Sequence, residues 1–357
     1  MTRFFCLTLS IGLLWMQCVF TCVASDLTHI PDKAPQPLPV AMSLSVLDIQ
    51  GIRENLNIMA ATIQLREVWQ DPRLAFDPIR EGVDRLIYAN QDATLFLEQH
   101  WNPRLVITNL VNTTGTPEVG VVVQPDGTVT EIRTLDGGFS IHSDYSDFPF
   151  DQQSFPIDIA SDRYDRTKLM LLYGADEKAS STISRTVDLA QWLLLGLAGN
   201  HYTSAGWDGA SYEHLSIHLI VRRNTLQYAP QIFLPYLFIM LAPLLILVIR
   251  VDDVFQKATM LSGAALATIA LQFSVGTSLP EVVLTDNIVS RMFWFAYGFL
   301  VVMLLLSITI YNTTLKLLKD KHLLEELRVQ LNWIPAALFL VLLAGTILAP
   351  MLRRTFS

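Results

Sequence analysis

Hydrophobic and polar positions follow two different patterns along this chain. From Val40 to Val221, short apolar runs alternate with polar residues and are separated by turn residues, with no long helical pattern between them. Residues 121–132 alternate around Asp126 and Gly127, which is typical of a tight β-hairpin. The first pattern therefore predicts an all-β domain, an antiparallel sandwich of immunoglobulin-like type but larger.

The second pattern, after residue 221, consists of long apolar runs. We expect helices at about residues 228–249, 258–279, 292–311 and 333–352. Each run is long enough to cross a hydrocarbon core of ~30 Å as an α-helix. The chain is thus predicted to have an extracellular sandwich over residues 26–221 and a four-helix transmembrane domain over residues 222–357.

Residues 1–25 have the features of a secretory signal peptide. Arg3 precedes an apolar run, and the run ends in small residues that would permit cleavage near Ala24. A fifth membrane helix is the alternative, and the small residues after the run argue against it. With a cleaved signal peptide, the sandwich would lie outside the membrane.

Charge in the links between the apolar runs bears on orientation. The links at residues 250–257 and 312–332 would lie inside, and the positive-inside rule expects basic residues there. They contain Arg250, Lys257, Lys316, Lys319, Lys321 and Arg328. Arg291 and the pair Arg353-Arg354 oppose this orientation, so charge supports it only in part.

Composition narrows the class of protein. Hydrophobic residues make up 51% of the 357 residues, too many for a purely soluble protein. Cys6, Cys18 and Cys22 all precede the predicted mature chain, which excludes a disulfide scaffold and a cysteine-ligated metal site.

Charge is distributed unevenly between the two predicted domains. Residues 26–221 carry 26 acidic and 13 basic side chains, whereas residues 222–357 carry 7 acidic and 11 basic side chains. This acidic domain would concentrate cations, although solubility alone would also explain it.

The second apolar run, from Ala258 to Thr277, is rich in small and hydroxylated residues that lipid would not favour. Residues spaced alternately by four and three positions would share one face of this helix. They are Thr259, Gly263, Leu266, Ala270, Phe273 and Thr277. In a ring of identical subunits, Leu266 and Phe273 would form apolar rings that close a pore by dewetting. A tightly packed central helix without a pore is the alternative.

Three motifs precede the apolar runs in a fixed order. They are Trp69-Gln-Asp71-Pro-Arg73-Leu74, Trp101-Asn-Pro103, and the segment Ile141–Phe155 with Phe148-Pro149-Phe150-Asp151 at its centre. Together with the four runs, this order resembles the prokaryotic pentameric ligand-gated ion channels, the "Pro-loop" members of the Cys-loop receptor family. Ile141 and Phe155 stand where animal receptors have the two loop cysteines.

The resemblance implies a homopentameric ion channel in the lipid bilayer of the inner membrane, with its N-terminal domain in the periplasm. It would be opened by a small-molecule agonist, with an amine as one candidate, or by protons, for which His142 and His201 are candidate sensors. The stripe of the second run would line the pore. Permeant monovalent cations are expected, with Asp252, Asp253 and Gln256 at the inner mouth. The acidic ring of the family's cation channels is replaced here by Gln256, and the insertion typical of anion channels is also absent.

The resemblance also implies residues that couple the two domains and residues that bind the agonist. The coupling residues are Glu54, Phe148, Pro149, Asp151, Arg222 and Pro280. Arg222 is expected to form ion pairs with Asp151 and Glu54, because an unpaired guanidinium at this boundary would be costly. The agonist residues are Thr108, Asn109, Ser161, Asp162, Tyr202, Trp207 and Tyr212, faced across the subunit interface by Gln64 and Arg133.

Other function classes receive less support. A membrane-anchored periplasmic binding or sensor protein without a pore is the main alternative, although an anchor has no need of a small, hydroxylated second span. An enzyme is not expected, because the histidines lack a metal-ligand spacing and neither a Gly-x-Ser-x-Gly nor a phosphate-loop motif occurs. We expect no cofactor, no metal and no nucleic-acid partner.

Overall fold

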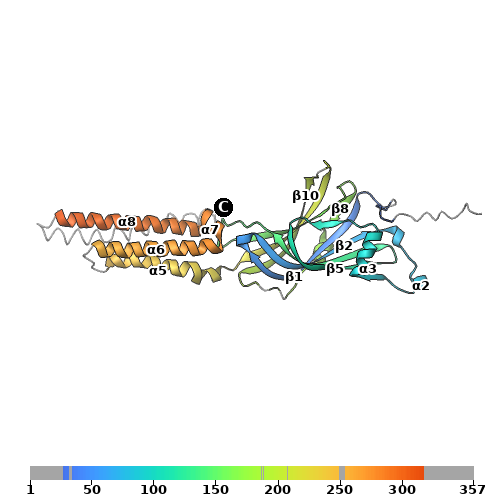
Figure 1. Cartoon of the computed structure of the whole chain (residues 1–357), viewed down its shortest axis with the longest axis horizontal. Coiled ribbons are helices and arrows are strands. Elements are labelled where there is room, and N and C mark those ends of the chain that lie inside the picture. Colours follow the sequence, from blue (N-terminus) through green and yellow to red (C-terminus); the bar gives the residue numbers. More distant parts are fainter. Residues whose placement is uncertain are drawn as a thin grey trace, which may run out of the picture.

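The computed structural model describes residues 27–31, 34–185, 187, 189–206, 208–248 and 254–316. Two β-sheets form one end of an elongated molecule, and long helices form the other (Figure 1). The predicted signal peptide and the fourth apolar run lie outside these residues.

Within the described residues, the larger sheet has seven strands in the order β3-β5-β6-β2-β1-β8, with β9 also paired to β1. Its strands are β1 (Leu38–Arg53), β2 (Ile58–Gln70), β3 (Leu86–Ala89), β5 (Leu110–Val123), β6 (Thr128–Ser140), β8 (Leu169–Leu172) and β9 (Thr182–Ile183). The second sheet has the order β10-β11-β7-β4. Its strands are β4 (Leu105–Ile107), β7 (Gln152–Ser161), β10 (Trp192–Ala205) and β11 (Ser211–Arg223).

The core lies between these sheets and follows the two-residue period of the strands. Ile63 and Leu65 of β2 are fully buried, as are Phe139 of β6 and Phe155 of β7. The short helices α2 (Pro78–Glu81), α3 (Gln91–Gln99) and α4 (Ala175–Ser180) and the 3-10 helices η1 (Glu54–Leu56), η2 (Pro72–Leu74) and η3 (Thr225–Gln227) lie in the connections. The predicted sandwich is therefore present, as two sheets of mainly antiparallel strands.

The hairpin expected around Asp126 and Gly127 joins β5 to β6. Gly127 has a φ of +84°, in the left-handed region that favours glycine. A Cβ at this position would lie 2.5 Å from the backbone oxygen of Asp71. Both the turn and its contact with the segment after β2 therefore require glycine.

The first three apolar runs form long helices, and the helix of the third run extends beyond the run at both ends. The first is helical from Ala229 onward, as the π-helix η4 (Ala229–Phe233) followed by α5 (Leu234–Val248). The next are α6 (Val254–Ser278), the short α7 (Pro280–Leu284) and α8 (Ile288–Lys316). In the part of the chain that the structure describes, three helices are long and apolar enough to cross a membrane.

The segment Ile141–Phe155 connects the sandwich to the helices. Its first eleven residues form the connection between β6 and β7, and its last four belong to β7. Two of its aromatic side chains, Tyr145 and Phe148, pack in a cluster with residues of the neighbouring helices. The cluster contains Tyr145, Phe148, Tyr228, Ile232, Val275, Leu279, Val282, Val289 and Phe293. The loop, the first helix, α6, α7 and α8 therefore share one apolar contact at the junction.

Candidate functional site

One buried arginine at the end of β11 organises this junction. The guanidinium of Arg223 is 0% exposed and lies between two carboxylates. Its Nε and Nη2 donate to Asp151 at 2.6 and 2.9 Å, and its Nη2 and Nη1 donate to Glu54 at 2.5 and 2.9 Å. Nη1 also donates to the Tyr228 hydroxyl at 2.9 Å. The five hydrogen bonds engage all three guanidinium nitrogens, and every carboxylate oxygen of the two acids accepts at least one of them.

Aromatic rings surround this cation and exclude water from it. The guanidinium carbon of Arg223 lies 4.1 Å from the Trp192 ring centre and 4.9 Å from that of Phe148. Tyr228 and Tyr145 lie at 5.5 and 5.9 Å. Such rings attract a cation by their negative faces, most strongly where it is desolvated.

The pKa of Arg223 reflects two opposing causes. Burial alone would lower it, but the hydrogen bonds and charges of Glu54 and Asp151 raise it overall. The two carboxylates therefore stabilise the charged form of Arg223.

The sequence analysis expected Arg222 to pair with Asp151 and Glu54. In the structure the next residue, Arg223, makes these ion pairs. Arg222 is exposed, whereas Arg223 is buried. Side chains alternate between the faces of a strand, so the buried residues Leu219 and Val221 of β11 place Arg223, not Arg222, on the inner face. The apolar alternation was visible in the sequence and could have assigned the cation correctly.

The other expected coupling residues lie at the same junction. Glu54 begins η1 and is buried, and Phe148 packs in the junction cluster. The carbonyl of Pro149 accepts a hydrogen bond from Thr225 at 3.2 Å. Pro280 is the first residue of α7, whose Val282 belongs to the junction cluster. The sequence did not indicate Tyr228 or Trp192, because their roles depend on where Arg223 lies.

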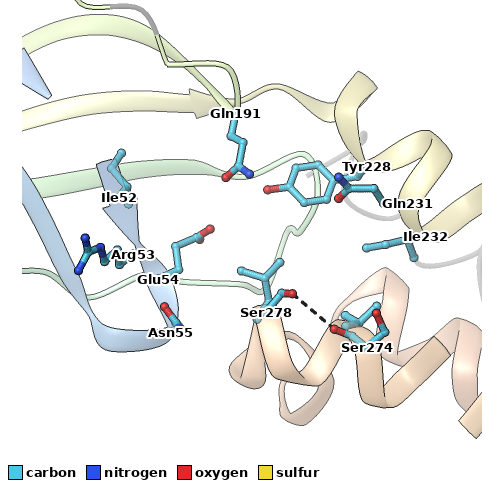
Figure 2. Close-up of a pocket in the computed structure, with 12 residues that line it drawn as sticks. Ile52, Arg53, Glu54, Asn55, Gln191, Tyr228, Gln231, Ile232, Ser274 and Ser278 are labelled. Carbon is cyan, nitrogen blue, oxygen red and sulfur yellow. Dashed lines mark hydrogen bonds between the residues drawn. The ribbon is translucent and has the colours of Figure 1, made fainter. Parts of the chain in front are cut away.

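A cavity of about 580 Å³ lies between the turn that contains Glu54, the beginning of the first helix and the C-terminal end of α6. Figure 2 shows Glu54, Gln191 and Tyr228 on one side of it and Ser274 and Ser278 of α6 on the other. The ion-pair network is thus adjacent to α6 as well as to the first helix.

The helix α6 exposes one face and packs with another. The predicted pore-lining residues are all exposed in the single chain: Thr259, Gly263, Leu266, Ala270, Phe273 and Thr277. Leu266 is 69% and Phe273 is 73% exposed. Leu261, Ala264 and Thr268 are buried against the neighbouring helices. Gln256 is also exposed, and Asp252 and Asp253 lie outside the described residues.

Some of the side chains expected to bind an agonist instead form hydrogen bonds to the backbone, and others lie where a ligand could contact them. Asn109 bonds to the backbones of Ser140, Pro156 and Asp158, and the Ser161 hydroxyl donates to the Pro103 carbonyl at 2.8 Å. Both side chains therefore hold loops together. The Thr108 hydroxyl donates to the Asp158 carbonyl at 3.4 Å.

The available side chains lie on and beside the β10–β11 hairpin. Tyr202 is 42% exposed and stacks on His214, with 4.7 Å between ring centres. Burial, followed by the charge of Asp158, raises the pKa of Tyr202. The Tyr212 hydroxyl donates to Asp208 at 3.1 Å. Two further expected residues remain to be placed: Asp162 lies 3.8 Å from Arg104, and Trp207 is outside the described residues.

The expected pair Gln64 and Arg133 cannot both face a neighbouring subunit. Arg133 is opposite the buried Leu65 in the β2–β6 ladder, so its side chain lies on the inner face of the sheet. Gln64 lies on the other face and donates to Thr134 at 3.3 Å. The prediction for Arg133 is therefore wrong, because the register of β6 directs its side chain into the sandwich.

Residues 26–225 match the family model of the neurotransmitter-gated ion-channel ligand binding domain, over more than half of the chain. The chain belongs to the pentameric ligand-gated ion channels. The resemblance found in the motifs is thereby confirmed, and this family is one of ion channels rather than enzymes.

Three relatives illustrate the range of this ion-channel family. The proton-gated ion channel of Gloeobacter violaceus is 24% identical over 274 residues, 76% of this chain and 72% of the relative. The neuronal acetylcholine receptor subunit beta-4 of Bos taurus is 23% identical over 294 residues, which cover 81% of this chain and 56% of the relative. The gamma-aminobutyric acid receptor subunit rho-3 of Homo sapiens is 24% identical over 222 residues, which cover 59% of this chain and 44% of the relative. The chain therefore spans about half the length of these animal relatives.

Proposed function

We propose that this ligand-gated ion channel is a homopentamer that conducts monovalent cations across the inner membrane. Its sandwich lies in the periplasm, and a small amine or protons acting at the interface between neighbouring sandwiches open it. The observation that carries this proposal is the exposed stripe on α6, on which Leu266 and Phe273 are largely exposed in the single chain. Thr259 and Thr277 are exposed on the same stripe and would be unfavourable against lipid, so this face is better suited to a pore axis or a second copy.

The junction supplies a route from agonist to gate. Arg223 ends β11, the second strand of the hairpin that bears Tyr202, and it binds Glu54 and Asp151 within contact of the first helix. The adjacent apolar cluster joins Phe148 to α6 and α8. Movement of the hairpin would therefore change contacts on the pore helix without an intervening flexible link.

Selectivity for cations is supported by charge. The sandwich domain carries twice as many acidic as basic side chains, 26 against 13 in residues 26–221, so its summed potential attracts cations ahead of the pore. Asp252 and Asp253 would add negative charge at the inner mouth.

Recording from the purified full-length chain in planar bilayers tests the proposal against a pore-free sensor protein. We expect unitary currents that depend on an added amine or on external pH, and a reversal potential in a salt gradient that follows the cation. A sensor that is only anchored gives no unitary current under either condition, and that result would reject the channel.

A further inference from the structure

A second buried cluster of two carboxylates and one guanidinium lies inside the sandwich. Glu67 of β2 and Glu131 of β6 are directly opposite each other in the ladder, and both point into the interior. Their exposures are 0% and 2%. Like charges in directly opposed positions are destabilising, and Arg133 is the cation beside them.

The guanidinium of Arg133 donates hydrogen bonds to Glu131 but not to Glu67. Arg133 donates to Glu131 Oε1 from Nη2 at 2.6 Å and from Nε at 3.2 Å, and its Nη1 donates to the Leu105 carbonyl at 3.0 Å. Its nearest approach to Glu67 is 3.5 Å. Within the described residues, neither carboxylate oxygen of Glu67 accepts a hydrogen bond.

The Arg223 network provides an internal comparison. There, one guanidinium donates to all four carboxylate oxygens of its two acids. Here, Glu67 has no donor of its own. A buried carboxylate without hydrogen bonds is so costly as an anion that it takes up a proton instead.

We propose that Glu67 is a proton-binding site in the core of the sandwich, with Glu131 and Arg133 determining its occupancy. Two carboxylates and one guanidinium carry a net charge of −1 when all are ionised, and one bound proton makes the cluster neutral. The proton is held on a carboxylate oxygen of Glu67 in the conformation described here.

The electrostatic surroundings agree with this site. Burial, followed by the charge of Glu131, raises the pKa of Glu67 well above its usual range, and the charge of Arg133 offsets part of the increase. A cavity of about 340 Å³ lies beside the cluster and is lined by Glu131 and Arg133. The charged groups on its other walls are Glu98 of α3, Arg104 before β4 and Asp162 after β7.

The sign of the pH dependence follows from the raised pKa. Between the unfolded pKa of about 4.3 and the higher folded pKa, the folded chain holds a proton that the unfolded chain has lost. The proton on Glu67 therefore contributes stability that is fully present below this window and is lost as pH rises through it. The unfolding equilibrium constant increases by up to about tenfold per pH unit within the window.

The test compares the pH dependence of unfolding in the purified full-length protein and its variants, between about pH 5 and pH 8. The wild type should lose stability as pH rises. Glu67→Gln should abolish that loss, because the variant has no proton to release. Glu131→Gln should weaken that loss without removing it, because the charge of Glu131 raises the pKa of Glu67 only after burial, which this substitution leaves in place. Glu98→Gln, an exposed carboxylate on the same cavity, is the matched control and should behave as the wild type.

Infrared difference spectra over the same pH range report directly on the protonated carboxyl group. The wild-type spectra alone test the proposal if a variant fails to fold. The wild type should show the carbonyl band of a buried carboxylic acid, and Glu67→Gln should lack it. Wild-type spectra without that band, or an unchanged pH dependence in Glu67→Gln, would overturn the proposal. Stabilisation of the wild type at high pH by added calcium, lost in Glu67→Gln, would identify a metal-ion site and overturn it as well. Neither readout requires channel activity, so the result is independent of the proposed function.

Discussion

Replacing Arg223 by glutamine removes the cation from the junction and leaves two acids behind. Glu54 and Asp151 are only 4% and 2% exposed at their side chains, so both acids lose their donor in a largely buried environment. Removing one partner from a buried ion pair typically costs about 3–5 kcal/mol. Five hydrogen bonds are lost at once, and we expect Arg223→Gln to reach the upper part of that range.

The matched control is Arg222→Gln, because the two arginines are adjacent in sequence and differ in burial. Arg222 is exposed, and substitutions at such sites usually change stability by no more than about 0.5 kcal/mol. The measurement is the unfolding of the purified full-length protein, with its assembly checked on a sizing column. Equal destabilisation by the two substitutions would refute the assignment of Arg223 as the organising cation.

A double-mutant cycle separates the ion pair from general damage. Arg223→Gln combined with Glu54→Gln should cost less than the sum of the two single changes, with a coupling energy in the range of about 0.5–3 kcal/mol. In channel recordings, coupling of this kind should change agonist sensitivity by roughly 5-fold to 150-fold. Additive effects in both assays would place the link between sandwich and helices elsewhere.

Three further predictions concern α6, the two aspartates that precede it in the sequence, and a turn. Leu266→Ser should raise the resting current and the agonist sensitivity, because a polar ring favours the wet state of a pore; a wild-type dose response would place this residue away from the pore. Neutralising Asp252 and Asp253 together should move the reversal potential in a salt gradient toward that of a non-selective pore, and an unchanged potential would place selectivity elsewhere. Gly127→Ala should lower the unfolding free energy by about 1–3 kcal/mol more than Gly115→Ala, because both residues have positive φ but only the first would meet a backbone oxygen, at 2.5 Å. Equal losses in thermal unfolding of the two variants would contradict that explanation.

The sequence by itself determined the features that depend on local pattern. The two-residue period predicted the strands, and Asp126-Gly127 predicted the β5–β6 turn, because few residues tolerate a positive φ. The length of the apolar runs predicted the long helices. The motif around Pro149 indicated the family, and the four-and-three spacing on α6 selected the residues that the fold leaves exposed.

Only the tertiary structure decided which charges meet. The choice between Arg222 and Arg223 depends on which face of β11 is buried, and the period of the strand contained that information once one face was known. The position of Arg133 required the register of β6 against β2, which pairs residues 68 positions apart along the chain. The bare carboxylate of Glu67 was not predictable at all. Its environment is set by Glu131 and Arg133, which both come from another strand. Arg133 approaches Glu131 to 2.6 Å but Glu67 only to 3.5 Å, and this difference exists only in the packed sandwich.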